Sequence, residues 1–208
     1  NVHVVWQDNR NGPVQIFWAQ RKKDIEAWVS SGQYGQDTVI MQQKDFNDPY
    51  IEGAVQFKNP KLSYTHPRIW MVSESLKESE NISSIYISSF NVEQKYWQSM
   101  GVPVFNSNGE FIADGTSILV TSPDRFCTNP SITINGTNGE IAIVWEDQTE
   151  PISQIWGASF NSSGTEITSS TKITSRINNC FNPVIGFSAN QAAIVFESDN
   201  NLYMSHYD

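Results

Sequence analysis

The sequence has little of what several large protein classes require. It contains no run of about 18 apolar residues, so no transmembrane helix is expected. Only 13 residues are Lys or Arg against 22 acidic ones, and the net charge is −9. Because nucleic acids and anionic membrane surfaces are bound by clustered cations, both are poor partners for this chain. The three histidines and two cysteines are spread without metal-ligand spacing, and no convincing helix pattern occurs.

The common catalytic motifs are also missing. No G-x-S-x-G elbow, G-x-x-x-x-G-K-[ST] loop or G-x-G-x-x-G loop is present. We therefore expect no cofactor, and we predict that the chain is not an enzyme. The dense D-x-D-x-D-G pattern of a calcium loop is absent as well, so Ca²⁺ is only weakly indicated.

The chain contains short segments that recur in a fixed order. Three Asn-Pro pairs begin alternating segments, at Asn59, Asn129 and Asn182. Proline at the first residue of a strand costs no ladder hydrogen bond, so each pair is predicted to open a strand. A more apolar segment with an acidic or amide end follows, and then one with an aliphatic-aromatic pair. Those pairs are Ile16-Phe17, Ile85-Tyr86, Ile155-Trp156 and Leu202-Tyr203.

The repeats predict an all-β fold, a β-propeller or partial propeller of about four four-stranded blades. The approximate units are 1–56, 57–126, 127–179 and 180–208 of a single repeat domain. The first unit lacks its first strand and the last lacks its fourth, so we expect a fragment of a larger chain or propeller. A β-sandwich is the alternative, since it also consists of many short strands.

Two kinds of residue are candidates for binding. If the units superpose, the acids at the ends of the second strands ring one face and bind Ca²⁺ or a cationic partner, or else cap turns and pair with nearby Arg or Lys. Aromatic residues that depart from the repeat are the other kind, whereas Trp6 and Trp145 share a column with Phe196 and are expected in the core. The ligand-binding candidates are Asp8, Arg10, Trp18, Glu74, Tyr96, Trp97, Glu146, Asp147 and Glu197.

Two further sets of residues suggest covalent modification. Cys127 and Cys180 each lie two residues before an Asn-Pro pair, and equivalent positions of adjacent blades approach near the axis. They either form a disulfide or remain as two buried thiols. Glycosylation sequons begin at Asn81, Asn135 and Asn161, in predicted turns.

The segments 4–8 (VVWQD) and 155–161 (IWGASFN) with Gly164 resemble bacterial-type β-propeller surface repeats of the form V-V-W-Q-D followed by I-Y-x-x-R-F-N-x-x-G. The resemblance implies a secreted, periplasmic or cell-surface protein whose propeller face binds a protein or glycan without catalysis. A sialidase-like or other propeller glycosidase is an alternative, with Glu74, Asp147 and Glu197 as the first suspects, although the S-x-D-x-G-x-x-W turn is absent. A structural spacer in a larger protein is the third possibility.

Overall fold

A computed structural model describes residues 2–9, 14–24, 27–29, 38–41, 55–77, 81–93, 96–97, 104–105, 111–113, 117–122, 124–188 and 191–207. Every regular element in these ranges is a β-strand, which confirms the predicted all-β class. None of the described residues forms a helix long and apolar enough to cross a membrane.

Four antiparallel sheets follow one another along the chain, and we name them sheets 1 to 4. Sheet 1 contains β1 (Val2–Asp8), β2 (Gln15–Lys22), β3 (Ala27–Val29) and β4 (Thr38–Met41). Sheet 2 contains β5 (Val55–Thr65), β6 (Arg68–Lys77), β7 (Ile82–Asn91), β8 (Tyr96–Trp97) and β11 (Ser117–Leu119). Sheet 3 contains β12 (Cys127–Ile134), β13 (Ile141–Asp147), β14 (Gln154–Phe160) and β15 (Glu166–Lys172). Sheet 4 contains β16 (Phe181–Ser188), β17 (Gln191–Ser198) and β18 (Asn201–Tyr207), while β9 (Val104–Phe105) and β10 (Phe111–Ala113) form a separate pair.

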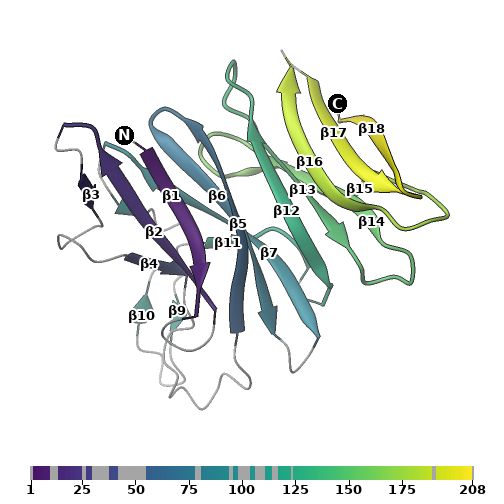
Figure 1. Ribbon diagram of the computed structural model, residues 1–208, viewed down its shortest axis with the longest axis horizontal. Coiled ribbons are helices and arrows are strands. Elements are labelled where there is room, and N and C mark those ends of the chain that lie inside the picture. The colour runs from purple at the N-terminus through teal and green to yellow at the C-terminus, as the bar shows by residue number, and fades with distance from the viewer. Residues whose placement is uncertain are drawn as a thin grey trace.

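The four sheets stand side by side across the molecule in chain order, from the N-terminus to the C-terminus (Figure 1). Strand β12 lies beside β5 on one side and β16 on the other, so the first strands of sheets 2, 3 and 4 are neighbours. We call β5, β12 and β16 the inner strands. Their adjacency brings the three Asn-Pro pairs into one region of the protein.

Strand β13 is buried along its whole length because sheet 3 has a neighbour on each face. Successive side chains of a strand point to opposite faces. Ile143 and Trp145 therefore pack toward sheet 2, in one cluster with Trp70. Ala142 and Val144 belong to a second cluster with residues of sheet 4. This arrangement accounts for the near-continuous apolar run in the sequence of β13.

The two end sheets each bury only one face among the described residues. In sheet 4, Val184, Leu202 and Met204 are 63%, 72% and 64% exposed. In sheet 1, Val2 is 54% exposed and Val4 is 36% exposed. The position of Leu202 is buried in the middle sheets, as Ile85 and Ile155, and is uncovered in sheet 4.

Candidate functional site

The inner strands share one backbone irregularity at their Asn-Pro pairs. Asn59, Asn129 and Asn182 have φ of 49°, 50° and 48°, in the left-handed region that Asn tolerates better than most residues. The pairing with the next strand shifts register around each of them. The prediction that the Asn-Pro pair opens each strand is therefore wrong. Each inner strand begins before its pair, and the pair forms a bulge where the missing proline N–H is not needed.

The bulged asparagines bind side chains of the second strands, within a sheet and between sheets. Asn59 Nδ2 donates to Glu74 Oε1 of the same sheet at 2.7 Å. The main-chain N–H of Asn129, in sheet 3, donates to the same oxygen. Glu74 therefore joins sheet 2 to sheet 3 through one carboxylate oxygen.

Glu146 repeats this arrangement between sheets 3 and 4. Its Oε1 accepts from Asn129 Nδ2 at 2.8 Å and from the main-chain N–H of Asn182. At the two ends the pattern is half complete: Gln7 accepts from the main-chain N–H of Asn59 at 2.8 Å, and Glu197 accepts from Asn182 Nδ2 at 3.3 Å. We call this series the asparagine–carboxyl ladder, which comprises Gln7, Asn59, Glu74, Asn129, Glu146, Asn182 and Glu197.

Glu74 is a member of the ladder whose ionisation is perturbed by burial. Its side chain is buried, and burial raises the pKa of its carboxyl above the ordinary 4.5, assisted by the negative charge of Glu146. The hydrogen bonds from Asn59 and Asn129 act in the opposite direction and do not offset the burial. Glu74 is thus a carboxyl that holds its proton more tightly than usual.

The two buried carboxylates of the ladder differ in their second oxygen. Glu146 Oε2 accepts from Thr128 Oγ1 at 3.3 Å and from Gln148 Nε2 at 3.0 Å. In the described part of the chain, Glu74 receives its hydrogen bonds on Oε1 alone. Glu146 is therefore fixed by donors on both oxygens, whereas the second oxygen of Glu74 is available to carry a proton.

A pocket of about 320 Å³ lies over the ladder, and we call it the inner-strand pocket. This volume is at the lower end of the range of small-molecule sites. Lys61 is the one cationic side chain among the described lining residues, and the three ladder asparagines provide amides. The described lining residues are Asn59, Lys61, Asn129, Pro130, Ser131, Asn182, Pro183 and Val184.

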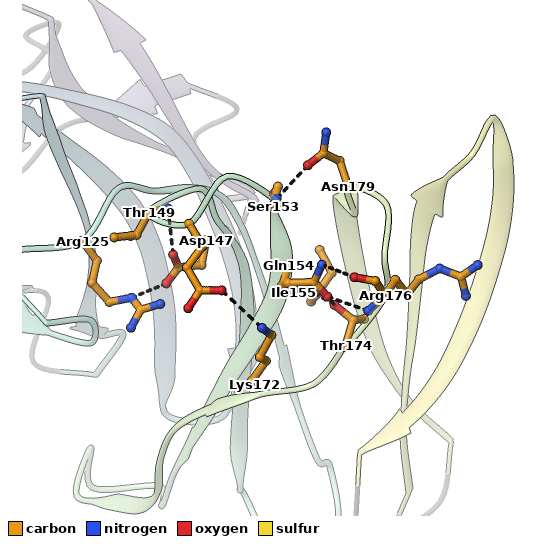
Figure 2. Close-up of polar contacts among 11 residues, drawn as sticks. Arg125, Asp147, Thr149, Ser153, Gln154, Ile155, Lys172, Thr174, Arg176 and Asn179 are labelled. Carbon is orange, nitrogen blue, oxygen red and sulfur yellow. Dashed lines mark hydrogen bonds and ion pairs between the residues drawn. The ribbon is translucent and has the colours of Figure 1, made fainter.

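Asp147, adjacent to Glu146 in sequence, belongs to a separate ion pair that Figure 2 shows. Its Oδ2 accepts from Arg125 Nε, and its Oδ1 accepts from the main-chain N–H of Thr149 at 3.0 Å. The Arg125 guanidinium lies 4.3 Å from the ring centroid of Trp156. Burial and the neighbouring Asp147 raise the pKa of the Cys127 thiol, which keeps it protonated and unreactive. Asp147 is therefore committed to holding Arg125 in place.

The loop between sheets 3 and 4 repeats this arginine arrangement. Arg176 lies 3.8 Å from the ring centroid of Tyr203, which occupies the aromatic column of Trp156. Gln154 binds the backbone of Arg176 from both sides, donating to its carbonyl at 3.1 Å and accepting from its N–H at 3.0 Å (Figure 2). In both sheets an arginine preceding the inner strand stacks on the aromatic residue of the third strand.

The structure separates the predicted binding residues into groups. Glu74, Glu146 and Glu197 share the ladder, whereas Trp18 is buried, with 3% of its surface exposed. Asp8 ends β1 and is half-buried. Arg10 is outside the described residues. The main chain of Tyr96 and Trp97 pairs with β7. Within the described ranges no group of three or more His, Cys, Asp or Glu side chains is arranged to hold a metal ion.

The residues considered for covalent modification are also placed. Cys127 and Cys180 are free thiols, so the possible disulfide is not formed. The reason is that they lie in different clusters, Cys127 between sheets 2 and 3 and Cys180 between sheets 3 and 4. Among the sequons, Asn135 is only 2% exposed, which leaves no room for a glycan, while Asn81 lies in an exposed turn. Asn161 Oδ1 accepts three hydrogen bonds from Ser163 and Thr165 within its own turn.

Sequence reasoning missed the asparagines as the partners of the acids. The available signal was their spacing, because Asn59, Asn129 and Asn182 precede the acid that they bind by 15, 17 and 15 residues. A repeated amide at a fixed distance from a repeated acid indicates a contact between them. The Asn-Pro pairs had been interpreted only as strand openers.

Comparison with known proteins gives the fold and no close relative. No family model and no curated protein matches the sequence. The structure is similar to that of a GH43 endo-arabinanase from Bacillus licheniformis, with a TM-score of 0.50 and 15% identity over 98% of this chain and 66% of that one. It is similar to an endo-arabinase from Bacteroides thetaiotaomicron, with a TM-score of 0.51 and 12% identity over 98% of this chain and 69% of that one. It is also similar to the polysaccharide lyase Uly1, with a TM-score of 0.55 and 8% identity over 99% and 46% of the two chains.

These similarities correct the prediction that the chain is not an enzyme. The chain has the fold of a GH43 endo-arabinanase, an endo-arabinase and a polysaccharide lyase, and nearly its whole length superposes on each. It spans about two thirds of the two arabinan-cleaving enzymes and under half of the lyase. The absent sequence motifs belong to other enzyme classes, so their absence excluded less than we had inferred.

Proposed function

We propose that this chain is part of a β-propeller enzyme that hydrolyses a polysaccharide, with a sugar residue bound in the inner-strand pocket. The observation that carries this proposal is the buried Glu74 carboxyl beside that pocket. Asn59 and Asn129 both line the pocket and both bind Glu74, so the carboxyl lies directly behind the lining. The shared fold with carbohydrate-cleaving enzymes supports the same reading.

Glycoside hydrolysis needs a carboxylic acid that remains protonated long enough to protonate the leaving oxygen. The pKa of Glu74 is shifted in the direction that this role needs, and the cause of the shift is burial. Glu146 has the same ladder contacts, but donors occupy both of its oxygens. We therefore assign the role of general acid to Glu74 and a purely structural role to Glu146.

The propeller is part of the proposal. The four described sheets are interpreted as consecutive blades, which is consistent with the resemblance to bacterial-type surface repeats. Among the described residues, Glu197 receives a ladder hydrogen bond from its own sheet alone, whereas Glu74 and Glu146 also receive one from the asparagine of the next sheet. The exposed Val184, Leu202 and Met204 form the face on which a further blade packs. An extracytoplasmic location, where polysaccharides are met, stays a prediction.

The test is cleavage of polysaccharides and its loss in one variant. The protein is incubated with linear arabinan, with a uronate-containing polymer and with a panel of fluorogenic glycosides, and new reducing ends are measured. We expect hydrolysis of at least one substrate, and a loss of kcat of at least about 100-fold in Glu74→Gln, the scale of general acid catalysis. Elimination products with a new double bond would identify a lyase and contradict the hydrolytic proposal.

A matched control comes from the ladder itself. Gln7 accepts the same main-chain hydrogen bond as Glu74, so a glutamine at this position preserves the ladder. Glu146→Gln changes the equivalent carboxylate of the next sheet, and because its second oxygen accepts from Gln148 Nε2, the stability of this variant is measured alongside. The folded variant is expected to retain activity. Equal activity in Glu74→Gln and the unsubstituted protein would remove Glu74 from the mechanism.

A further inference from the structure

A second pocket of about 440 Å³ lies between sheets 1 and 2. Its described lining residues are His3, Leu62, Ser63, Tyr64, Ile69 and Val92. Along β5, Tyr64 is separated from Asn59 of the ladder by about 17 Å of extended chain. We call this the sheet 1–2 pocket, and it is distinct from the inner-strand pocket in place and in lining.

The sheet 1–2 pocket is lined by His3, at a position that varies from sheet to sheet. His3 pairs with Gln20 of β2, and Trp70 pairs with Ser89 of β7. Each pair lies one position beyond the small residue common to the third strands, so His3 and Trp70 are equivalent. Trp70 is fully buried between sheets 2 and 3, and the same position is Ala142 in sheet 3 and Ala193 in sheet 4.

Neighbouring side chains of sheets 1 and 2 hold the imidazole of His3 in place. Trp18 stands where sheet 3 has Gly157, and its Nε1–H donates to His3 Nδ1 at 3.3 Å. The two rings stack with centroids 5.8 Å apart, and Phe90 lies 4.8 Å from Trp18. Gln20 Nε2 lies 3.3 Å from His3 Nε2, so both ring nitrogens of His3 have partners within sheet 1. Trp18 therefore acts as a positioning residue for His3.

The side chains that line the sheet 1–2 pocket indicate which class of ligand it binds. Leu62, Ile69 and Val92 give it apolar walls, and Tyr64 lies at the pocket with 59% of its side chain exposed. The polar side chains on the described lining are neutral, so a charged ligand would lose its hydration without a counter-charge. A ring with one apolar face and several hydroxyls matches an aromatic platform with a few polar groups.

We propose that the sheet 1–2 pocket binds a neutral sugar residue of the polysaccharide, with Tyr64 as its stacking platform and the His3 ring in its wall. This inference rests on the proposed function, because the sugar belongs to the same polymer that the inner-strand pocket acts on. The second pocket holds the chain of a polymeric substrate away from the point of cleavage. The sheet 1–2 pocket therefore raises the affinity for a polymer and leaves the affinity for a short glycoside unchanged.

The experiment follows the ring signals of the histidines by NMR during titration with arabinopentaose, a neutral oligosaccharide. The titration uses the full chain carrying Glu74→Gln, which prevents cleavage. The sequence has three histidines, and His3 alone lines the pocket, so its signals are expected to shift while those of His66 and His206 stay in place. Tyr64→Ala is expected to raise the Kd for arabinopentaose, obtained from the His3 signals, at least tenfold. His3→Trp, which copies Trp70, is expected to fill the pocket and lower affinity for the pentasaccharide by a similar factor.

Leu202→Ala serves as the control because Leu202 is an exposed apolar residue on the far face of sheet 4. It should leave the titration unchanged. Unshifted His3 signals, or equal affinity in Tyr64→Ala and the control, would overturn the proposed sugar site even if the enzyme cleaves polysaccharide. Conversely, a protein that cleaves no substrate and still shows the His3 shift would refute the hydrolase and retain the sugar site. Should His3→Trp fail to fold, the exposed Tyr64→Ala variant still decides the outcome.

Discussion

Gln7 and Glu74 occupy equivalent positions in adjacent sheets, and each accepts a hydrogen bond from the main-chain N–H of the bulged asparagine in the following sheet. One is an amide and the other a buried carboxyl. The contact between sheets therefore needs an acceptor oxygen and does not need a charge. A buried carboxyl with a raised pKa is a feature of functional sites, and Glu74 differs from Glu146 in having no described donor on its second oxygen.

Replacing Glu74 by glutamine should change the pH dependence of stability in a defined direction. The pKa of Glu74 is raised above 4.5, so the native state binds its proton more tightly than the unfolded state. Its favourable contribution is present below pH 4.5 and is lost as the pH rises through the native pKa. We expect Glu74→Gln to gain stability relative to the unsubstituted protein between pH 4 and pH 7, measured by urea unfolding at each pH. A constant difference across this range would contradict the buried, proton-retaining carboxyl.

The bulge at Asn129 combines a backbone requirement with a side-chain hydrogen bond. Asn129→Ala should destabilise the protein by about 2–4 kcal/mol, since it places alanine at positive φ and leaves the buried Glu146 with one donor fewer. Asn129→Gly keeps the backbone freedom and loses only the side-chain donor, so a smaller loss is expected. Chemical denaturation of the two variants separates the contributions. Equal losses would show that backbone strain plays no part.

Arg125 compensates the charge of Asp147, whose side chain is only 2% exposed. Arg125→Ala should lower the free energy of unfolding by about 3 kcal/mol, because it leaves a buried carboxylate without its partner. Arg125→Lys keeps a positive charge but loses the planar stack on Trp156, so an intermediate value is expected. The measurement is thermal or urea unfolding at pH 7. An unchanged stability in Arg125→Ala would mean that Asp147 finds another donor.

Gly157 is required by packing. A Cβ at this position would lie 2.7 Å from Ile173 Cδ1 and 3.2 Å from the carbonyl oxygen of Ile143. The isoleucine methyl group can move, but the backbone carbonyl cannot do so easily, so Gly157→Val should cost about 1–3 kcal/mol. Gly136→Ala is the control, because nothing lies within 4 Å of a Cβ placed there. Similar melting temperatures for the two variants would contradict this account.

His3 should make stability fall as the solution becomes acidic. Burial lowers its pKa below the usual 6.5, so the unfolded state takes up a proton that the native state resists. Its contribution is fully present above pH 6.5 and is lost as the pH falls through the native pKa. His3→Gln should therefore lose less stability than the unsubstituted protein between pH 7 and pH 5, measured by urea unfolding. His66→Gln, at a residue 68% exposed in its side chain, is the control.

The sequence was sufficient for the all-β class because that class depends on local patterns. Alternating apolar residues and the recurring aliphatic-aromatic pairs predict strands. Their repetition along the chain predicts several sheets with the same strand order. The acidic column grouped Glu74, Glu146 and Glu197 with Asp8 and Asp147, whereas the structure places Gln7 in the ladder and pairs Asp147 with Arg125. The sequence could not show that Glu74 and Glu146 are buried, because burial depends on which sheet packs against which.

Sequence periodicity thus determined the strands, their order and the positions that repeat. Tertiary structure alone decided what each repeated position does. The asparagine of one sheet reaches the carboxyl of the sheet before it, a contact that spans 55 residues between Glu74 and Asn129. The same packing makes Trp18, a predicted binding residue, a buried hydrogen-bond donor to His3. These roles arise from contacts between sheets, and the sequence of a single strand carries no information about the surface that it will meet.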